Sequence, residues 1–443
     1  MNIKLAKYSM WITALLINVI GMSTIYSVTR YSSDGIRNSF NNQMKFLIIS
    51  IVFTLLVCRL PSRFWKILTP WAYMGTLILL TAVLVIGKEI NGAQSWIQLP
   101  GLSIQPSEFL KFSLVIALAK VLSAKYQQNR LQDFLLVFFV SALPLLLILM
   151  QPDLGTAMTL IPMVIGVTYL SGYDLPHIGM LIALGSLGFI LLIVSAIHEW
   201  EWIPIHTYQL GRIIRLFHQD ELAPLLSLGH IPPQIIMWST IALSVLSLIM
   251  ASSWRKLIWV FLIVGHAYPL YQWSSQTEEH RIAVNEHFLK PFRAKRMIEE
   301  PQLIAAKYAL ANGNLTGQGW RQGEQTQYQR LPYAYSDLIF AAFTEEWGFV
   351  GALFLLGLYT LLVLSLIVMA SKVEDKFCAL SLSGIALMLM GQIFIHVGYT
   401  TGIIPMTGIT MPFMSAGGTA LFTTWVGIAL AHSCASHGNE YQR

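Results

Sequence analysis

The sequence predicts an all-α polytopic membrane protein, and two observations lead to this fold class. Of the 443 residues, 55% are hydrophobic and only 11% are charged, whereas about 25% of the residues in an average soluble domain are charged. Apolar runs of about 20 residues, enough to cross a bilayer core about 30 Å thick, recur evenly along the chain. We therefore predict one integral membrane domain over residues 1–443.

About twelve such runs are predicted membrane helices. The fourth is less apolar because it carries Glu108, Lys111 and Lys120. We expect it to face protein or a polar cavity instead of lipid. The predicted spans are 10–28, 45–60, 67–87, 107–124, 133–150, 155–172, 177–198, 235–251, 257–271, 343–370, 376–399 and 412–433.

Basic residues give the predicted orientation of these spans. Short cytoplasmic loops carry an excess of Lys and Arg, and several short segments on one side of the predicted array are basic. Both termini are therefore expected in the cytoplasm, and residues 272–344 are expected to form a large extracytoplasmic loop. The residues that set this orientation are Lys4, Lys7, Arg59, Arg63, Lys66, Lys125, Arg130, Arg255, Lys256, Lys372 and Lys376.

Charge and cysteine content argue against two other classes of function. The net charge of +6 does not indicate nucleic-acid binding, because the basic residues are spread over loops instead of forming one block. Cys58, Cys378 and Cys434 lie in or beside apolar runs and have no Cys-x-x-Cys spacing. They predict neither a metal site nor a disulfide framework.

The most informative polar residue is Asp337, in the segment YQRLPYAYSDLIFAAFTEEWG (328–348), where a polar stretch enters a long apolar run. A carboxylate at a membrane boundary is costly, so it is by default a functional candidate. Asp337 is therefore the leading catalytic candidate. The structural alternative is a helix N-cap, because Asp337 directly precedes Leu338 and Ile339.

Two earlier outer loops contain helix-breaking residues. Residues 88–107 are expected to form a structured re-entrant or interfacial loop, followed by a helix with Ser107 as its N-cap and Glu108 in its first turn. Lys111 lies three residues after Glu108 and on the same helix face, where the two charges would form a buried pair. In the next outer turn, Asp153 is expected to cap a helix.

The loop 272–344 has two halves of different composition. The first half contains cations at amphipathic spacing, which predicts a helix on the headgroups that can bind lipid phosphates, or else a solvated surface helix. The second half, 313–327 (GNLTGQGWRQGEQTQ), has closely spaced glycines that would let its backbone approach a polar ligand, or else make it a flexible loop. The cations of the first half are Lys290, Arg293, Lys295 and Arg296.

Five motifs, in order from about residue 91 to 430, resemble the SEDS family of bacterial cell-shape, division and sporulation proteins. They are QPSEFLK, QPDLGT, GQGWRQGEQTQ, YSDLIFAAFTEEWGF and GIIPMTGITMPFMSAGGTAL. The short tails resemble the rod-shape branch more than the division branch. Membership implies a SEDS-type bundle of about ten helices in the bacterial cytoplasmic (inner) membrane, so residues 199–271, which hold two of the predicted spans, are interpreted as an insertion.

The resemblance implies a peptidoglycan glycosyltransferase that polymerises lipid II, an undecaprenyl-diphosphate-linked disaccharide-peptide, for cell elongation. The essential aspartate of the family matches Asp337, and the glutamate and lysine of its QPSE motif match Glu108 and Lys111. Asp153 and Glu345 match further motif positions and are interpreted as supporting residues. A class B penicillin-binding protein and other membrane proteins of the elongation complex are the implied partners.

Three segments depart from the family pattern. Members usually carry an acidic residue and a histidine shortly before the essential aspartate, whereas this chain has Tyr333-Ala334-Tyr335. The late SYGG-like block contains Ser415-Ala416 here. His396 stands where an asparagine is common, and in an apolar helix it is interpreted as a buried helix-contact residue.

The residues suit the implied chemistry. A sugar hydroxyl must displace pyrophosphate from an anomeric carbon, and a carboxylate that takes the hydroxyl proton typically contributes about 100- to 10,000-fold. Because lipid II is α-linked and the polymer is β-linked, we expect a single inverting displacement with Asp337 as the base. Cations, or a Mg²⁺ or Mn²⁺ ion held by a carboxylate, would stabilise the leaving group. The candidate cations are Lys111, Arg293, Arg296, Arg321 and Arg330.

Two other functions remain open at the level of sequence. A lipid II flippase would also use broken helices and a buried Glu108–Lys111 pair, but its key charges should lie near the membrane midplane. An inactive scaffold that positions a partner cell-wall synthase is the second alternative, suggested by Tyr333 and Tyr335.

Overall fold

The computed structural model describes residues 2–30, 34–90, 93–99, 102–124, 131–151, 153–174, 176–185, 302–404 and 406–439. The chain divides into two compact units. The first contains residues 1–125, 139–171 and 301–443, and the second contains residues 126–138 and 172–300. All the site residues described below lie in the first unit.

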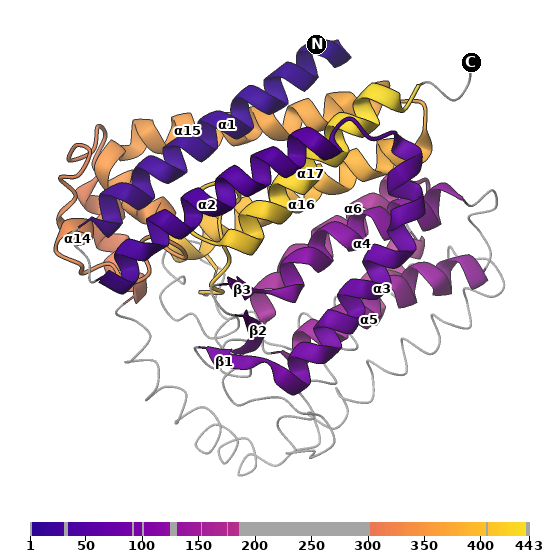
Figure 1. Ribbon diagram of the computed structural model, residues 1–443, viewed down its shortest axis with the longest axis horizontal. Coiled ribbons are helices and arrows are strands. Elements are labelled where there is room, and N and C mark those ends of the chain that lie inside the picture. Colours follow the sequence, from indigo (N-terminus) through magenta and orange to yellow (C-terminus); the bar gives the residue numbers. More distant parts are fainter. Residues whose placement is uncertain are drawn as a thin grey trace. The chain divides into compact units, whose positions relative to one another are not determined.

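The described part of the chain is mainly helical (Figure 1). Residues 302–312 and 176–185 are helical as well. The labelled helices are α1 (Ile3–Thr29), α2 (Asp34–Val57), α3 (Ser62–Ile86), α4 (Pro106–Ser123), α5 (Leu131–Met150), α6 (Leu154–Leu170), α14 (Glu324–Gln327), α15 (Ile339–Lys372), α16 (Lys376–Thr401) and α17 (Gly418–His437).

These helices confirm the predicted fold class. Within the described residues, six helices are long and apolar enough to cross a membrane: α1, α2, α3, α5, α15 and α16. Helix α4 is buried along most of its length, Glu108 and Lys111 included, which confirms that the fourth span faces protein. The predicted spans at 235–251 and 257–271, most of the span at 177–198, the insertion 199–271, and Arg293 and Arg296 all lie outside the described residues.

Helix α16 is the centre of the first unit, where it packs against α4, α6, α15 and α17. Apolar contacts alone give membrane helices no preference for one another over lipid, so close packing and interhelical hydrogen bonds hold such bundles together. Such bonds join segments that are far apart in the sequence here. The Asn18 amide donates to the Phe413 carbonyl at 3.0 Å, and the Thr54 hydroxyl donates to the Trp425 carbonyl at 3.1 Å.

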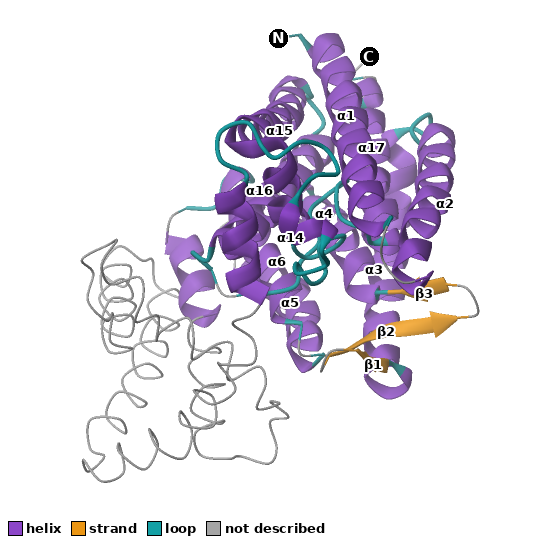
Figure 2. Ribbon diagram, turned by 90° about the vertical axis from the view of Figure 1, so that its left-hand side faces the viewer, coloured by secondary structure: helices purple, strands orange, loops and turns teal. Residues whose placement is uncertain are grey.

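The loop between α3 and α4 is a small antiparallel sheet of β1 (Lys88–Ile90), β2 (Ala93–Leu99) and β3 (Leu102–Ile104), drawn in orange in Figure 2. The prediction that residues 88–107 are structured is confirmed, and their form is a β-meander. Ile97 pairs with Ile104 across β2 and β3. The Thr419 hydroxyl donates to the Ser103 carbonyl at 3.2 Å, which ties the sheet to α17.

Candidate active site

Asp337 lies in the turn that leads into α15. The helix begins at Ile339, with Leu338 at the N-cap position and no side-chain capping bond. The alternative role of Asp337 as the N-cap is therefore wrong. The carboxylate faces the loop before α17, because a β-carbon built on Gly408 would lie 3.6 Å from the Asp337 Oδ2 atom. The side chain is half-buried.

Three consecutive main-chain carbonyls, those of residues 335–337, each accept a hydrogen bond from a residue that follows much later in the chain. Two donors come from the late SAGG block, and the third comes from α16. The bonds run from the Ala416 amide to the Tyr335 carbonyl (2.8 Å), from the Ser415 hydroxyl to the Ser336 carbonyl (2.7 Å) and from the Tyr399 hydroxyl to the Asp337 carbonyl (2.6 Å). The backbone of the Asp337 turn is thus held by one of the family-like motifs and by α16.

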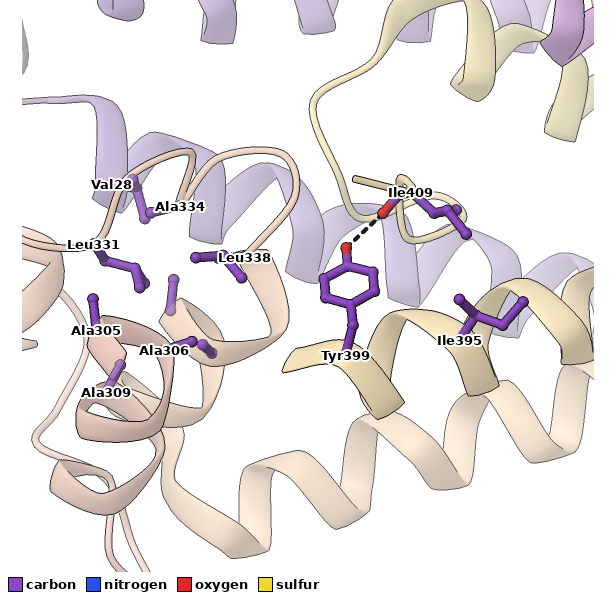
Figure 3. Close-up of a cluster of buried hydrophobic side chains, with 12 residues drawn as sticks. Val28, Ala305, Ala306, Ala309, Leu331, Ala334, Leu338, Ile395, Tyr399 and Ile409 are labelled. Carbon is purple, nitrogen blue, oxygen red and sulfur yellow. Dashed lines mark hydrogen bonds between the residues drawn. The ribbon is translucent and has the colours of Figure 1, made fainter. Parts of the chain in front are cut away.

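An apolar cluster supports this turn from beneath (Figure 3). Leu338 is fully buried beside Ala341 and Ala342 of α15, and the helix 302–312 contributes three alanines. Small side chains let this helix approach α15 closely. The cluster consists of Val28, Ala305, Ala306, Ala309, Leu331, Ala334, Leu338, Ala341, Ala342, Ile395, Tyr399 and Ile409.

Helix α15 is broken at Gly348, which has a φ of +69° and a ψ of −172°. In an unbroken helix the carbonyls of Glu345 and Glu346 would accept from residues 349 and 350. Instead, the Gln318 and Gly319 amides donate to these carbonyls, each at 3.0 Å. The freed amides of residues 349 and 350 donate to the carbonyls of residues 314 and 315, at 2.9 and 3.0 Å. The glycine-rich segment is therefore inserted into the helix ladder, so the flexible-loop interpretation of its composition is wrong for residues 314–319.

Close approach explains why this segment is rich in glycine. Gly317 has a φ of +82°, and a β-carbon on it would lie 2.2 Å from the Glu346 carbonyl oxygen. The backbone of the glycine-rich segment thus approaches α15. The sequence had suggested a polar ligand as the group that this backbone would approach.

Substitution of Gly317 by Ala tests this packing. The new methyl group would require a strained backbone and would overlap a carbonyl, so we expect a loss of about 1–3 kcal/mol of unfolding free energy. Gly357 provides the control, because it lies in α15, the helix that Gly317 approaches, and no atom is near its β-position. Gly357→Ala should leave the unfolding free energy unchanged or raise it by up to about 1 kcal/mol. Thermal unfolding in detergent measures both. Equal midpoints for the two variants would contradict the account.

Glu345 and Glu346 are fully buried at the start of α15. The Glu345 carboxylate accepts from the amides of Gln325 (2.7 Å) and Thr326 (3.0 Å), in the first turn of α14. The Ser27 hydroxyl of α1 and the backbone amide of Arg321 both donate to the Glu346 carboxylate. Glu345 thus supports the loop, because its carboxylate binds the loop backbone.

The described candidate cations lie at different places. Arg321 lies beside Glu346, and its guanidinium carbon is 5.5 Å from the centre of the Trp320 ring. Arg330 forms an exposed ion pair with Glu324 at 3.2 Å. Lys111 is paired within α4.

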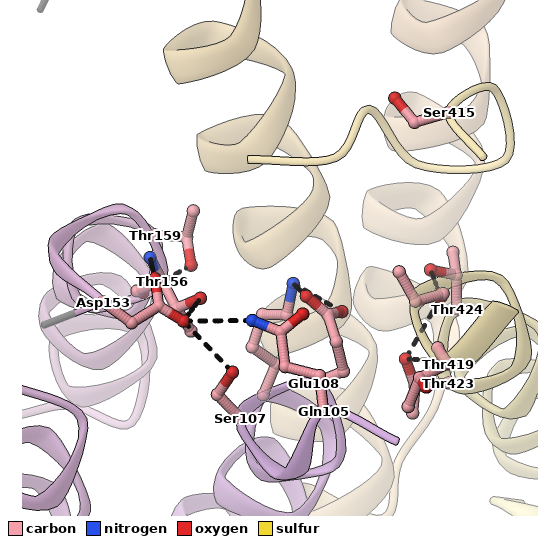
Figure 4. A network of polar contacts seen from close by, with 12 residues as sticks. Gln105, Ser107, Glu108, Asp153, Thr156, Thr159, Ser415, Thr419, Thr423 and Thr424 are labelled. Atoms are coloured by element: carbon pink, nitrogen blue, oxygen red, sulfur yellow. Dashed lines mark hydrogen bonds and ion pairs between the residues drawn. The ribbon is translucent and has the colours of Figure 1, made fainter. Parts of the chain in front are cut away.

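Glu108 and Lys111 form the predicted buried pair. Both Glu108 oxygens lie 2.7 Å from the Lys111 Nζ atom, and the two side chains are 6% and 3% exposed. The i, i+3 spacing places both groups on one helix face, as the sequence indicated. Figure 4 shows Glu108 beside Gln105 and Ser107 at the start of α4.

Asp153 is the N-cap of α6, as predicted. It accepts from the Thr156 amide at 3.0 Å and from the Thr156 hydroxyl at 2.8 Å. The prediction that Ser107 caps α4 is wrong, because Pro106 occupies the first turn and Gln105 takes the N-cap position. Gln105 and Ser107 instead donate to the Asp153 carboxylate, each at 3.2 Å, and so tie α4 to α6 (Figure 4).

Tyr333 and Tyr335, shortly before Asp337, depart from the family pattern. The phenol of Tyr335 is near enough to Asp337 to be affected by its negative charge. Burial raises the pKa of the Tyr335 phenol, and the negative charge of Asp337 raises it further. The phenol therefore stays protonated at neutral pH and can donate a hydrogen bond. Tyr399 was not recognised from the sequence, although it lies three residues after His396 and on the same helix face.

The fold and this site define a multi-pass membrane protein with a carboxylate in a fixed turn just before the N-terminus of a membrane helix. The chain belongs to the cell cycle protein family of FtsW, RodA and SpoVE, whose model matches residues 7–229 and 225–440.

Curated relatives and solved structures agree with this assignment. The chain is 29% identical over 441 residues to peptidoglycan glycosyltransferase RodA of Treponema pallidum, with 96% of each chain covered. It is 26% identical to peptidoglycan glycosyltransferase MrdB of Escherichia coli K12, covering 88% of this chain and 84% of that protein. It also resembles the crystal structure of Thermus thermophilus RodA (TM-score 0.59, 22% identity, 97% of each chain) and a chain of a peptidoglycan synthase complex (TM-score 0.65, 24% identity, 98% of each chain).

Proposed function

We propose that this chain is a peptidoglycan glycosyltransferase that polymerises lipid II into glycan strands for cell elongation and rod-shape maintenance, with Asp337 as the general base. Family membership and the names of the relatives support the class of enzyme. The single observation that carries the site is the fixed position of Asp337: its carboxylate does not cap the helix, and three neighbouring carbonyls are held by distant residues.

The geometry of α15 favours an enzyme over a flippase. Residues 349–372 alone form a helix about 36 Å long at 1.5 Å per residue, enough to cross a hydrocarbon core of about 30 Å. The side chains of Phe349, Val350 and Leu353 are exposed, as lipid-facing residues are, whereas residues 339–346 are all buried. This length supports the proposal that Asp337 lies beyond the spanning part of the helix, at the membrane surface.

In the proposed reaction, Asp337 accepts the proton of the attacking sugar hydroxyl as the new glycosidic bond forms. The bond from the anomeric carbon to the pyrophosphate breaks in the same step, so the α-linked donor gives a β-linked product by inversion. The leaving pyrophosphate carries away the bonding electron pair. Arg321, Arg330 and the Arg293 and Arg296 pair remain the candidate cations for it.

A divalent cation stays a prediction. Mg²⁺ is commonly bound by one or two carboxylates together with substrate phosphates, without a dedicated protein cage. Within the described residues no three His, Cys, Asp or Glu side chains converge. A Mg²⁺ or Mn²⁺ ion would therefore be held by a carboxylate together with the lipid pyrophosphate, and which carboxylate does so stays open. Such an ion would neutralise charge on the leaving group.

Partners and sidedness are also proposals. One of the similar structures is that of a peptidoglycan synthase complex in which polymerization and crosslinking are coordinated. By analogy, we expect this chain to bind a class B penicillin-binding protein, together with other elongation-complex membrane proteins. The bacterial cytoplasmic membrane is the expected location, with both termini in the cytoplasm and Asp337 outside.

Polymerisation of lipid II by the purified protein tests the proposal. We expect glycan strands to form in detergent or in liposomes, with a transpeptidase partner added if the chain alone is inactive, and muramidase should digest the product. Absence of strands with and without the partner, in a preparation that moves lipid II across vesicles, would establish the flippase alternative. Absence of both activities would favour the scaffold.

A further inference from the structure

Tyr399 lies at the centre of a small buried hydrogen-bond network between α16, the Asp337 turn and the loop before α17. Its hydroxyl oxygen lies 2.6 Å from the Asp337 carbonyl, 2.7 Å from the Ile409 carbonyl and 2.7 Å from the His396 Nδ1 atom. The His396 Nδ1 atom is itself 2.8 Å from the Ile409 carbonyl. Tyr399 and His396 are both completely buried, and Figure 3 shows the Tyr399 hydroxyl directed at Ile409.

Counting protons assigns the donors in this network. The two carbonyls only accept, the tyrosine hydroxyl has one hydrogen, and a neutral imidazole has one. Both carbonyls receive a hydrogen from this network only if the His396 Nδ1–H group donates to Ile409 and the Tyr399 hydroxyl donates to Asp337. The single Nδ1 hydrogen is then shared between the Ile409 carbonyl (2.8 Å) and the Tyr399 oxygen (2.7 Å) as a three-centre hydrogen bond. The tautomer is inferred from the network.

We propose that His396 and Tyr399 form a buried hydrogen-bond relay that positions Asp337 for catalysis through its main-chain carbonyl. The inference rests on the proposed function, because it needs Asp337 to be the base. Both residues are positioning residues: Tyr399 donates to the main-chain carbonyl of Asp337, and His396 acts through Tyr399 and the Ile409 carbonyl. The relay also fixes Ile409, next to Gly408, which faces the Asp337 carboxylate. It therefore sets the distance between the base and the loop opposite it.

A purely structural interpretation is that Tyr399 is one buried tyrosine among several. Tyr359 of α15 provides a close comparison, because it is buried to a similar extent and its hydroxyl donates to the Pro412 carbonyl at 2.5 Å. Pro412 lies in the same loop as Ile409. If the two hydroxyls only stabilise this loop, their removal should have the same consequences.

The test compares Tyr399→Phe with Tyr359→Phe in lipid II polymerisation. A displacement of about 1 Å at a reacting group can cost about 100-fold in rate, so we expect Tyr399→Phe to lower kcat about 10- to 100-fold, with KM changed less than about twofold. Tyr359→Phe should keep kcat within about twofold. The two thermal midpoints should fall by similar amounts. Equal kcat values for the two variants would overturn the relay, and so would a loss confined to KM.

His396 gives a second, independent test. Asparagine can place an amide N–H group near the position of Nδ1, whereas leucine cannot donate. We expect His396→Asn to keep polymerisation within about threefold and His396→Leu to lose as much kcat as Tyr399→Phe. The double variant His396→Leu with Tyr399→Phe should lose no more than either single variant, because residues of one network are not additive. Equal losses for Asn and Leu, or additive losses, would contradict the relay.

Asp337→Asn, measured on the same preparations, separates this inference from the proposed function. If Asp337→Asn is inactive while Tyr399→Phe matches Tyr359→Phe, only the relay fails. If Asp337→Asn keeps full activity, the assignment of the base fails, and the relay fails with it.

Discussion

Asp337→Asn is expected to lower the rate of lipid II polymerisation by at least about 100-fold, because loss of a general base typically costs about 100- to 10,000-fold. The amide has the shape of the carboxylate but cannot accept the hydroxyl proton. The three hydrogen bonds that fix this turn all end on main-chain carbonyls. They should persist in the variant, so a loss of rate reports chemistry and not a displaced backbone.

Two measurements make this result specific. The thermal midpoint of Asp337→Asn should stay close to that of the parent protein, and lipid II should still bind. Glu374→Gln provides the control, since Glu374 is an exposed carboxylate beyond the far end of α15. It should polymerise at the parent rate. Retained polymerisation by Asp337→Asn would remove Asp337 from the mechanism.

What the sequence predicted well is local. The membrane helices follow from hydropathy, which is a property of each segment alone. The Glu108–Lys111 pair follows from an i, i+3 spacing on one helix, and the Asp153 cap follows from a short turn. Each of these needs only neighbouring residues. The structure confirms the pair, the cap and, within the described residues, six of the predicted membrane helices.

What the sequence missed depends on contacts between distant segments. The hydrogen bonds that hold the Asp337 turn come from Tyr399 and Ser415. No local sequence pattern predicts contacts between segments so far apart in the chain. The glycines of residues 313–327 were interpreted as a surface for a ligand, because composition cannot show that the partner is the broken ladder of α15. The prediction that Ser107 caps α4 was wrong for a local reason. Proline favours the first helical position, so Pro106 already indicated Gln105 as the N-cap.

The buried ion pair of α4 should produce the largest change in stability. Lys111→Met leaves Glu108 buried without its cation, and breaking a buried pair in this way costs about 3–5 kcal/mol. Lys66→Met provides the matched control, because the Lys66–Asp375 pair is more exposed, with side-chain exposures of 39% and 13%. Its loss should cost about 0–1 kcal/mol. Thermal or denaturant unfolding in detergent compares the two.

The double variant Glu108→Gln with Lys111→Met separates the stability of the pair from its function. Removing both charges should recover most of the stability lost by Lys111→Met, because the cost of a broken pair comes from the unpaired buried charge. If the pair only supports the helix, the double variant should polymerise lipid II at nearly the parent rate. If it polymerises slowly although it is stable, the charges act on the substrate or on the Asp337 turn. If the protein were a flippase, the double variant would lose lipid II translocation, whereas Asp337→Asn would retain translocation. A translocation assay on the same variants can show this.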